Sequence, residues 1–431
     1  MILRKKVSAS LLVKEAKKLE KSQDFKGAFD KYEQLLANFP GNKIAQFKLS
    51  QLKTMPDIFE KKIEETVLLE DVLKRGDKAA VKSIAKEMIE NKTNNSFFFF
   101  HYAKVIDDSD VGKLLKIIEV ELDNPNLSQD NQLNFLMARY ELEKKKNEFH
   151  LAFDTLYLAN SIRYSKASFR PDKDEESVEK LKALFSSIDI KKASLRSRPS
   201  ETNLIFIVGM PRSGTTLLEQ VLCRHQKISS IGEKPFTTQF LSAANWQDKN
   251  KLNEILRDLK SFYQKNLKNE KLSTKFIIDK MPFNLFWVGF LALAYPSAKF
   301  FYYKRDARAT CWSNYETAFA EGNSYSFRLE DIVEHYNRCT LLMEFWKNLF
   351  PSRIYTFDYE KFVSNPITYG PNLFNFLDLD WSPSYLEVSR STTRVTTASQ
   401  LQVKEKIYSG SSEQWKNFIL RIGTKFSGLI E

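Results

Sequence analysis

The first part of the chain, from Ser8 to about Phe185, has the hydrophobic pattern of helices that pack against one another. Apolar residues recur at intervals of three and four, while glycine and proline are sparse, as is typical of amphipathic helices. One pattern, with apolar or small residues at relative positions 0, 3, 7 and 10, begins at Phe25 and again at Phe149. Weaker copies begin at Lys78 and Val111. The pattern predicts repeated helical hairpins.

The steps between these copies, 33 residues from 78 to 111 and 38 from 111 to 149, are close to the period of about 34 residues of tetratricopeptide helix pairs. The first copy resembles such a repeat well, and the others are degenerate; an irregular helical bundle is the alternative. Helical repeats present concave faces that bind partners. We therefore expect residues 1–195, a tetratricopeptide-like domain with a linker, to bind a protein partner rather than to carry chemistry.

From residue 196 the pattern changes to short apolar runs separated by amphipathic segments. The runs at 204–208, 275–279, 299–306 and 353–362 are rich in Ile, Phe, Val and Tyr, as buried parallel strands are. Strands that alternate with helices predict an α/β domain with a parallel central sheet covered on both faces, a three-layer arrangement. Pro199 and the polar residues after it mark the start of this domain, residues 196–431.

The first strand leads into a glycine-rich loop, in the segment LIFIVGMPRSGTTLL at 204–218. The spacing from Gly209 to Gly214 is that of a phosphate-binding loop, in which backbone N–H groups point at an anion in front of a helix N-terminus. Thr215 and Thr216 stand where a nucleotide kinase has Lys-Ser or Lys-Thr, and the loop's cation is Arg212. A plain turn between strand and helix is the alternative interpretation.

Charged side chains follow the later strands, at the sheet edge where α/β proteins bind ligands. Lys280 directly follows the run at 275–279, and Arg305 stands at the end of the run at 299–306. Ser313 lies on the next helix, at a spacing that can bring its hydroxyl and the guanidinium of Arg305 to one phosphate. Glu233 returns beside the loop after the first helix; it is either a general base or a solvated loop residue.

The net charge and the amino-acid composition of the chain disfavour several classes of function. The net charge of +12 suits an anionic substrate, although lysines scattered on helix faces explain it equally well. There is no cluster of basic and aromatic residues of the kind that binds nucleic acid, and no apolar run reaches the ~20 residues of a membrane span. The three cysteines form neither a disulfide framework nor a metal-binding spacing. We expect a cytoplasmic protein without a bound metal.

The order of these motifs resembles the sulfotransferases that use 3′-phosphoadenosine 5′-phosphosulfate (PAPS), especially bacterial tetratricopeptide-repeat sulfotransferases and tyrosylprotein sulfotransferases. The motifs are PRSGTT, GE, DKMP, a strand-end arginine with a serine on the next helix, DYE and RVTTASQLQVKEKIY, within 204–418. The resemblance implies a P-loop-type sulfotransferase domain. It places the 5′-phosphosulfate at the loop residues Arg212, Ser213, Gly214, Thr215 and Thr216.

The same resemblance implies roles for the other residues. Arg305 and Ser313 are expected to hold the 3′-phosphate, while Lys280 and Arg212 stabilise the transition state. Glu233 matches the catalytic base of the protein-tyrosine enzymes. Ser399 and Lys404 are expected to close over the nucleotide. Small-molecule sulfotransferases of the cytosol use a histidine base, and the matching region has none; His225 and His335 are expected to be structural.

The implied activity is transfer of a sulfuryl group from PAPS to a hydroxyl or amine, on a protein (as in protein-tyrosine sulfation), on a glycan held by the helical repeats, or on another acceptor. Two other functions remain open. One is a P-loop nucleotide kinase or NTPase, for which Asp279 is a partial candidate as the acidic Mg²⁺ ligand. The other is a scaffold whose catalytic half has decayed, although Arg212, Lys280, Arg305 and Ser313 are all present.

Overall fold

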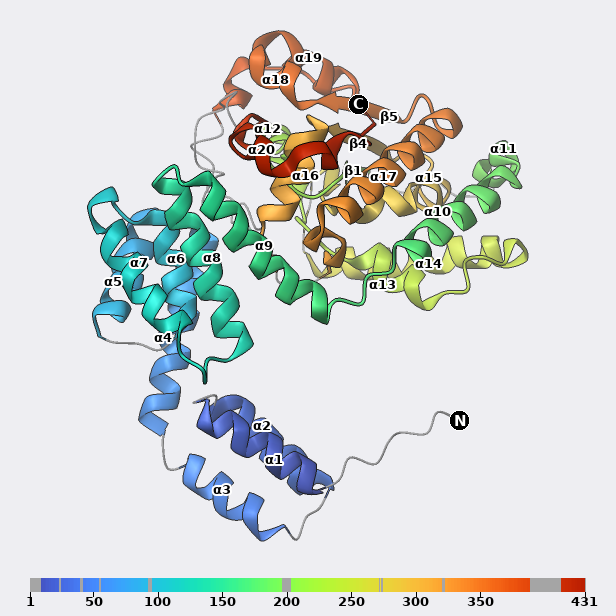
Figure 1. Cartoon of the computed structure of the whole chain (residues 1–431). Coiled ribbons are helices and arrows are strands. Elements are labelled where there is room, and N and C mark those ends of the chain that lie inside the picture. Colours follow the sequence, from blue (N-terminus) through green and yellow to red (C-terminus); the bar gives the residue numbers. More distant parts are fainter. Residues whose placement is uncertain are drawn as a thin grey trace. The chain divides into compact units, whose positions relative to one another are not determined.

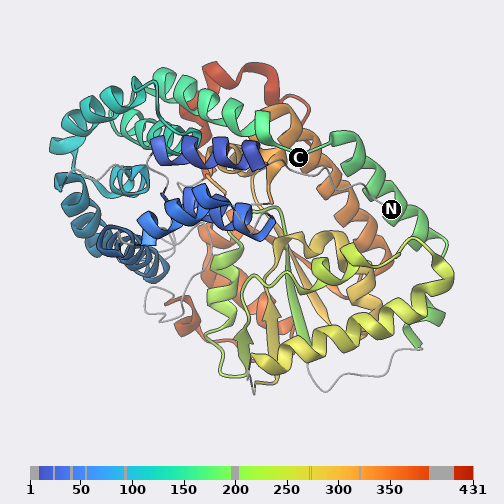
Figure 2. The same cartoon turned by 90° about the horizontal axis from the view of Figure 1, so that it is seen from below.

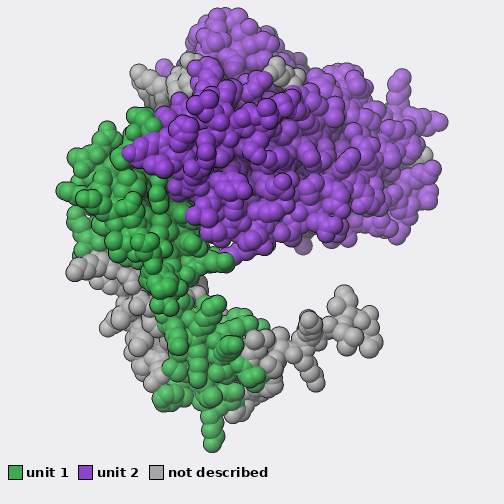
Figure 3. Space-filling model, viewed as in Figure 1, with its two compact units in different colours: residues 1–147 green, residues 148–431 purple. Residues whose placement is uncertain are grey.

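The computed structural model describes residues 9–22, 25–38, 42–53, 56–91, 95–195, 203–270, 272, 274–319, 322–387 and 412–430. The chain divides into two compact units, residues 1–147 and residues 148–431, which are labelled by element in Figure 1 and coloured separately in Figure 3. Among the described residues, none of the helices combines the length and the apolar character that a membrane crossing needs.

In the described parts of the first unit, every regular element is a helix. The helices are α1 (Ala9–Lys21), α2 (Phe25–Asn38), α3 (Lys43–Lys53), α4 (Pro56–Arg75), α5 (Lys78–Glu90), α6 (Ser96–Val105), α7 (Asp108–Leu122) and α8 (Gln129–Lys145). Helix α1 packs on α2, α5 on α6, and both α6 and α7 on α8. Ala16 and Ala28 are fully buried between α1 and α2, where small side chains let the helices approach closely. The assignment to tetratricopeptide repeats stays a prediction.

The second unit contains all the described strands. They are β1 (Asn203–Gly209), β2 (Ile228–Ser230), β3 (Phe276–Asp279), β4 (Lys299–Lys304) and β5 (Ile354–Asp358). They form one sheet in the order β2-β3-β1-β4-β5, and every pair is parallel. β1 lies at the centre, with Ile205 opposite Ile278 of β3 and Val208 opposite Tyr302 of β4. The short edge strand β2 is an addition to the strands that the sequence predicts.

Helices cover both faces of this sheet, and Figure 2 shows the strands between them. On one face, Ile205 and Ile207 pack in a core with α12 (Thr215–Leu222), α18 (Tyr359–Ser364) and α19 (Pro366–Asn375). On the other, the ring of Phe206 lies 6.1 Å from that of Tyr263, on α14 (Leu252–Asn269). The period of two along β1 therefore sends successive side chains to opposite layers. The predicted α/β class, with a helical region before it, is confirmed.

The remaining elements of the second unit connect and cover the strands. They are α9 (Phe149–Lys166), α10 (Pro171–Ser186), α11 (Ile190–Leu195), α13 (Phe236–Ala243), η1 (Lys249–Lys251), η2 (Pro282–Trp287), α15 (Val288–Ala294), α16 (Ala307–Glu316), η3 (Ser324–Phe327), α17 (Leu329–Leu349), η4 (Pro383–Leu386), η7 (Gln414–Phe418), α20 (Ile419–Ile422) and η8 (Gly423–Phe426).

The division between the units falls after Asn147, whereas the sequence places the domain boundary between residues 195 and 196. The difference concerns α9, α10 and α11, which pack with the α/β elements. Phe185 of α10 is fully buried, with its ring centroid 4.9 Å from that of Trp346 on α17. On α9, the amide of Asn160 donates to the carbonyl of Tyr315 at 2.9 Å. Most residues of α9, α10 and α11 are polar because one side of each helix faces solvent. For this reason the sequence composition does not indicate the buried contacts of these helices.

Candidate active site

The loop between β1 and α12 has a backbone that only glycine accommodates at two positions. Gly209 has φ 154° and Gly214 has φ 105°. A Cβ on Gly209 would lie 2.8 Å from the carbonyl oxygen of Tyr303, and one on Gly214 would lie 2.9 Å from its hydroxyl. Among the described residues that hydroxyl has no hydrogen-bond partner. The loop therefore packs closely against Tyr303 of β4. Gly214 is the N-cap residue of α12 and has a left-handed backbone conformation.

Side chains from β4 and α16 hold the outer side of the loop. The amide of Asn314 donates to the carbonyl of Pro211 at 2.8 Å, and Nη1 of Arg305 donates to the carbonyl of Arg212 at 3.0 Å. Nε of Arg212 in turn donates to the hydroxyl of Ser313 at 3.3 Å. The structure thus brings together the loop cation and the Arg305–Ser313 pair, which the sequence places more than ninety residues apart.

The loop's own polar side chains are enclosed. Ser213 donates its hydroxyl to the carbonyl of Met210 at 2.7 Å, and Ser213, Thr215 and Thr216 are buried. Burial lowers the pKa of the Arg212 guanidinium; the nearby Glu316 opposes this, and Arg305 adds to it. A partly buried guanidinium that lies near another cation favours an anionic ligand.

Lys280 lies between two carboxylates. It is 1% exposed, and its Nζ is 2.7 Å from Oε1 of Glu233 and 3.5 Å from Oε2 of Glu219. Glu219 belongs to α12 and also accepts a hydrogen bond from Ser230, while Glu233 lies on the loop after β2 and is 34% exposed. Buried lysines keep their charge only when an opposite charge compensates. The two carboxylates supply that compensation, one enclosed and one open to solvent.

Asp279 has surroundings different from those of the adjacent Lys280. It is fully buried; its side chain accepts hydrogen bonds from the hydroxyl of Tyr263 and, at 2.9 Å, from the backbone N–H of Met281. Burial raises the pKa of Asp279 to about 7, against these hydrogen bonds. Neighbouring residues of a strand point to opposite faces, so Asp279 packs under α14 while Lys280 reaches the carboxylates.

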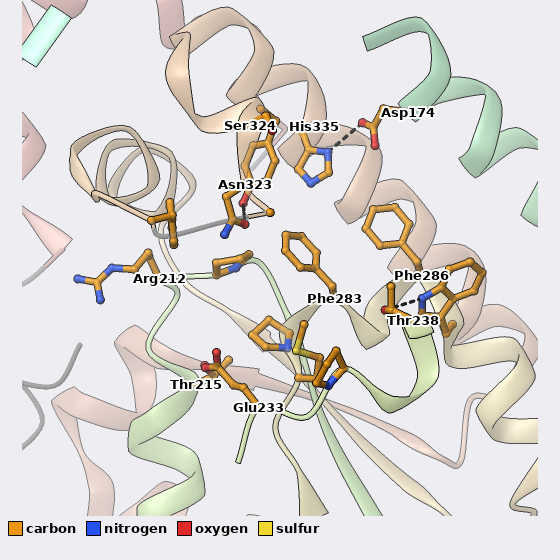
Figure 4. A pocket seen from close by; sticks show the side chains of 18 of the residues that line it. Asp174, Arg212, Thr215, Glu233, Thr238, Phe283, Phe286, Asn323, Ser324 and His335 are labelled. Atoms are coloured by element: carbon orange, nitrogen blue, oxygen red, sulfur yellow. Dashed lines mark hydrogen bonds and ion pairs between the residues drawn. The ribbon is translucent and has the colours of Figure 1, made fainter. Parts of the chain in front are cut away.

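A cavity of about 600 Å³ opens beside these groups. Arg212, Thr215 and Glu233 lie toward one end of it in Figure 4, with Phe283 between them and the His335–Asp174 pair. The full set of lining residues also includes Pro211, Gly214, Thr216, Phe169, Phe286, Trp287 and Tyr325. The cavity therefore joins a polar end at the loop to an end with aromatic walls.

The aromatic end contains a buried ion cluster that sequence reasoning missed. Nδ1 of His335 is 2.9 Å from Oδ2 of Asp174, and Nε of Arg338 donates to the same oxygen at 2.9 Å. Burial opposes the charged imidazole, but Cys339 and Asp174 outweigh it and raise the pKa of His335 to about 10. His335 therefore holds Asp174 and also lines the cavity; its structural role stays a prediction. His225, by contrast, pairs with Asp380 at 3.2 Å.

The candidate residues Ser399 and Lys404 lie outside the described residues. Within the described ranges, no group of His, Cys, Asp and Glu side chains could hold a metal ion. The remaining candidates are Arg212, Ser213, Gly214, Thr215, Thr216, Glu233, Lys280, Arg305 and Ser313. All of them lie on the loop, on the elements that bond to it, or on the Lys280 cluster beside the cavity.

Comparison with known proteins found similar sequences and a structural neighbour. An uncharacterized protein of Aquifex aeolicus is 29% identical over 321 residues, which cover 70% of this chain and 42% of that protein. A putative protein-tyrosine sulfotransferase of Caenorhabditis briggsae is 28% identical over 191 residues, 42% of this chain and 68% of the relative. The sulfotransferase domain from the curacin biosynthetic pathway is a structural neighbour with a TM-score of 0.37 and 20% identity, over 51% of this chain and 91% of that domain.

The chain thus spans less than half the length of the Aquifex relative. The match to a family model is more local: residues 204–383 match the model described as the sulfotransferase family. This range begins in β1 and includes the loop, Glu233, Lys280, Arg305 and Ser313. Residues 204–383 therefore form a domain of the sulfotransferase family.

Proposed function

We propose that the second unit transfers a sulfuryl group from PAPS to an acceptor hydroxyl or amine. The observation that carries this proposal is the convergence of separate cations on one loop. Arg212 contacts Ser313 at 3.3 Å, Arg305 contacts the carbonyl of Arg212 at 3.0 Å, and Arg212 and Glu233 line one cavity. A donor with phosphates at both its 5′ and 3′ positions needs cations arranged in this way.

The loop fits the donor's 5′-phosphosulfate. Gly214 leaves no side chain in front of the N-terminus of α12, where backbone N–H groups can donate to an anion. Arg305 and Ser313 would hold the 3′-phosphate, because a guanidinium and a hydroxyl on adjacent elements can both donate to it. We propose that the transfer proceeds without a bound metal.

Glu233 is the proposed general base. It would take the proton from the acceptor hydroxyl or amine as the acceptor atom forms its new bond to sulfur. The bond between sulfur and the bridging phosphate oxygen breaks, and the electron pair stays on that oxygen. Lys280 and Arg212 would neutralise the charge that develops there. Fixed cations of this kind contribute most of the catalysis where charge is spread in the transition state.

The pairing of Glu233 with Lys280 supports a coupled role. At 2.7 Å the ion pair fixes the carboxylate at the cavity. Once Glu233 is protonated, its attraction for Lys280 falls, and the ammonium can turn toward the leaving oxygen. Glu219 at 3.5 Å still compensates the buried charge of Lys280 in that state.

For the acceptor we propose a protein or a glycan that the helical repeats of the first unit bind, and of these a protein tyrosine is the better match. Aromatic rings on the cavity wall, such as Phe283 and Phe286, pack edge-to-face or offset against a phenol ring. A relative's name also includes protein-tyrosine sulfotransferase. Cytoplasmic localisation is part of the same proposal.

The kinase or NTPase alternative is disfavoured by Asp279. As the acidic Mg²⁺ ligand it would have to face the loop, yet its carboxyl group is buried against Tyr263 and the N–H of Met281. The decayed-scaffold alternative is disfavoured because the cations and the proposed base are all present and held in position.

Calorimetric titration tests the proposal. Adenosine 3′,5′-bisphosphate should bind at least about tenfold more tightly than AMP, since each lost charge-assisted contact is worth roughly 1.5–3 kcal/mol. ATP and GTP serve as controls for the kinase alternative. Equal affinity for the bisphosphate and AMP would contradict the assignment. Incubation with ³⁵S-labelled PAPS and tyrosine-containing peptides then tests transfer.

A further inference from the structure

Arg305, which follows β4, is held from two sides. Its Nη1 donates to the carbonyl of Arg212 at 3.0 Å, and its Nε donates to the hydroxyl of Ser412 at 3.1 Å. Its guanidinium carbon also lies 5.4 Å from the centroid of the Tyr359 ring. Ser412 lies beyond the residues that match the family model, which end at 383.

The hydroxyl of Ser412 has a defined direction. It donates to Oε1 of Glu360 at 2.7 Å, so it presents its lone pairs to Arg305. Glu360 lies in the first turn of α18, and the same oxygen accepts the backbone N–H of Asp306 at 3.1 Å. A chain of hydrogen bonds thus runs from Arg305 through Ser412 to Glu360, and its far end is fixed to the backbone that follows Arg305.

Ser412 separates the carboxylate of Glu360 from the guanidinium of Arg305. Without a hydroxyl between them, a carboxylate beside a guanidinium tends to form a direct bidentate pair, which would occupy the donors that a phosphate needs. With Ser412 between them, Glu360 orients the guanidinium through a neutral hydroxyl group. Holding a long side chain in place before binding also reduces the entropy lost when the ligand binds.

We propose that Ser412 and Glu360 are positioning residues that set the preference of this site for nucleotides with a 3′-phosphate. The proposal rests on the proposed function, in which Arg305 binds that phosphate. Neither residue touches the nucleotide in this role. Both act through the orientation and the charge of Arg305, so they affect the 3′-phosphate specifically and leave the rest of the nucleotide site unchanged.

The test measures the affinities of the full-length protein for adenosine 3′,5′-bisphosphate and for AMP, and takes their ratio. In Ser412→Ala the bisphosphate affinity should fall about three- to tenfold, the range for one ordinary hydrogen bond, because the lost bond acts on the ligand only through Arg305; AMP affinity should stay the same. Glu360→Ala should lower the ratio in the same way, and Ser412→Thr, which keeps the hydroxyl, should restore it. Ser427→Ala, an exposed serine of the same segment, is the matched control.

The outcomes separate this inference from the proposed function. If the unaltered protein does not prefer the bisphosphate, the proposed function fails, and this inference fails with it. If the unaltered protein prefers the bisphosphate and both alanine variants keep the full ratio, only the positioning role is wrong. A parallel loss of bisphosphate and AMP affinity would also overturn it, because that result indicates a general structural effect.

Discussion

Two buried ion clusters border the same cavity, and they are built in opposite ways. In one, the cation Lys280 lies between two carboxylates, of which Glu233 is 34% exposed. In the other, the carboxylate Asp174 lies between His335 and Arg338, and all three side chains are at most 14% exposed. The first, open cluster keeps one partner accessible to a ligand, whereas the side chains of the second, enclosed cluster are almost fully buried even though Asp174 and His335 line the cavity.

From this difference we infer that the open cluster takes part in the reaction and that the enclosed cluster stabilises the fold. A cluster with an open carboxylate can exchange a proton with an acceptor and then redistribute its charge. The enclosed cluster joins α10 to α17 and has little to exchange, although His335 lines the cavity. We therefore expect changes at Lys280 to reduce turnover, and changes at Asp174 to reduce stability.

Truncation is the strongest test of this comparison. A protein that starts at Ser197 has every residue of the Lys280 cluster but lacks Asp174. It also lacks buried side chains such as Phe185 and Leu156, each worth about 1.5–3 kcal/mol. These two side chains alone contribute about 3–6 kcal/mol, which reaches the lower end of the 5–15 kcal/mol stability of a typical domain. We therefore expect the protein that starts at Ser197 not to unfold cooperatively.

The matched control starts at Glu148, where the second unit begins. It should melt cooperatively and bind adenosine 3′,5′-bisphosphate, while losing affinity for a macromolecular acceptor if the first unit binds one. Thermal unfolding with and without the nucleotide compares the two proteins. A cooperative melt and normal nucleotide binding in the protein that starts at Ser197 would show that α9–α11 are dispensable, and would restore the boundary that the sequence predicts.

Lys280→Ala tests the open cluster. Removing one preorganised electrostatic contact typically lowers the rate by ~10²–10³, about 3–4 kcal/mol, so single-turnover transfer should fall by that factor while nucleotide affinity changes little. Lys280→Arg should recover little activity, because a planar fork does not replace a point charge of fixed reach. Near-normal transfer by Lys280→Ala would assign the transition-state role to Arg212 alone.

The sequence pointed to Lys280 and Glu233 of the open cluster, but not to Glu219 and not to the enclosed cluster, for a physical reason. Lys280 and Glu233 belong to short motifs at a strand end and in a loop, where the chemistry of α/β proteins is concentrated. Asp174 and His335 are separated by 161 residues and lie on helices whose patterns look like ordinary amphipathic surface. Nothing in a single sequence indicates that the two will pair.

The same contrast applies to the fold. The strands β1, β3 and β4 follow from runs of large apolar residues, because a buried parallel strand is apolar on both faces. The edge strand β2, Ile228–Ser230, is too short and too polar to show a period. The place of α10 was missed for a related reason: its buried face is a narrow stripe on a charged helix, and only the tertiary structure shows that Phe185 packs on Trp346.

Asp174→Asn tests the enclosed cluster. The change leaves His335 and Arg338 without their shared negative charge, and breaking a fully buried pair costs 3–5 kcal/mol. Because Asp174 is 14% exposed, we expect a smaller loss of unfolding free energy, about 2–3 kcal/mol. Urea unfolding measures it. The transfer rate per folded molecule should stay close to that of the unaltered protein, and a large selective loss of rate would place this cluster in the chemistry.

The smallest expected effect is the pH dependence of the unfolding free energy, which tests the charge of His335 in the enclosed cluster. The pKa of His335 is raised to about 10 in the folded protein, against about 6.5 for an unfolded histidine. A raised pKa means that the folded state binds the proton more tightly, so this stabilisation is fully present below about pH 6.5 and is lost as the pH rises toward 10. Unfolding free energies at pH 6, 8 and 10 should therefore fall more steeply in the unaltered protein than in His335→Gln. Taking the difference between the two proteins cancels other titrating groups, including Asp279. Parallel pH profiles would mean that His335 is neutral in the folded protein and that Arg338 alone holds Asp174.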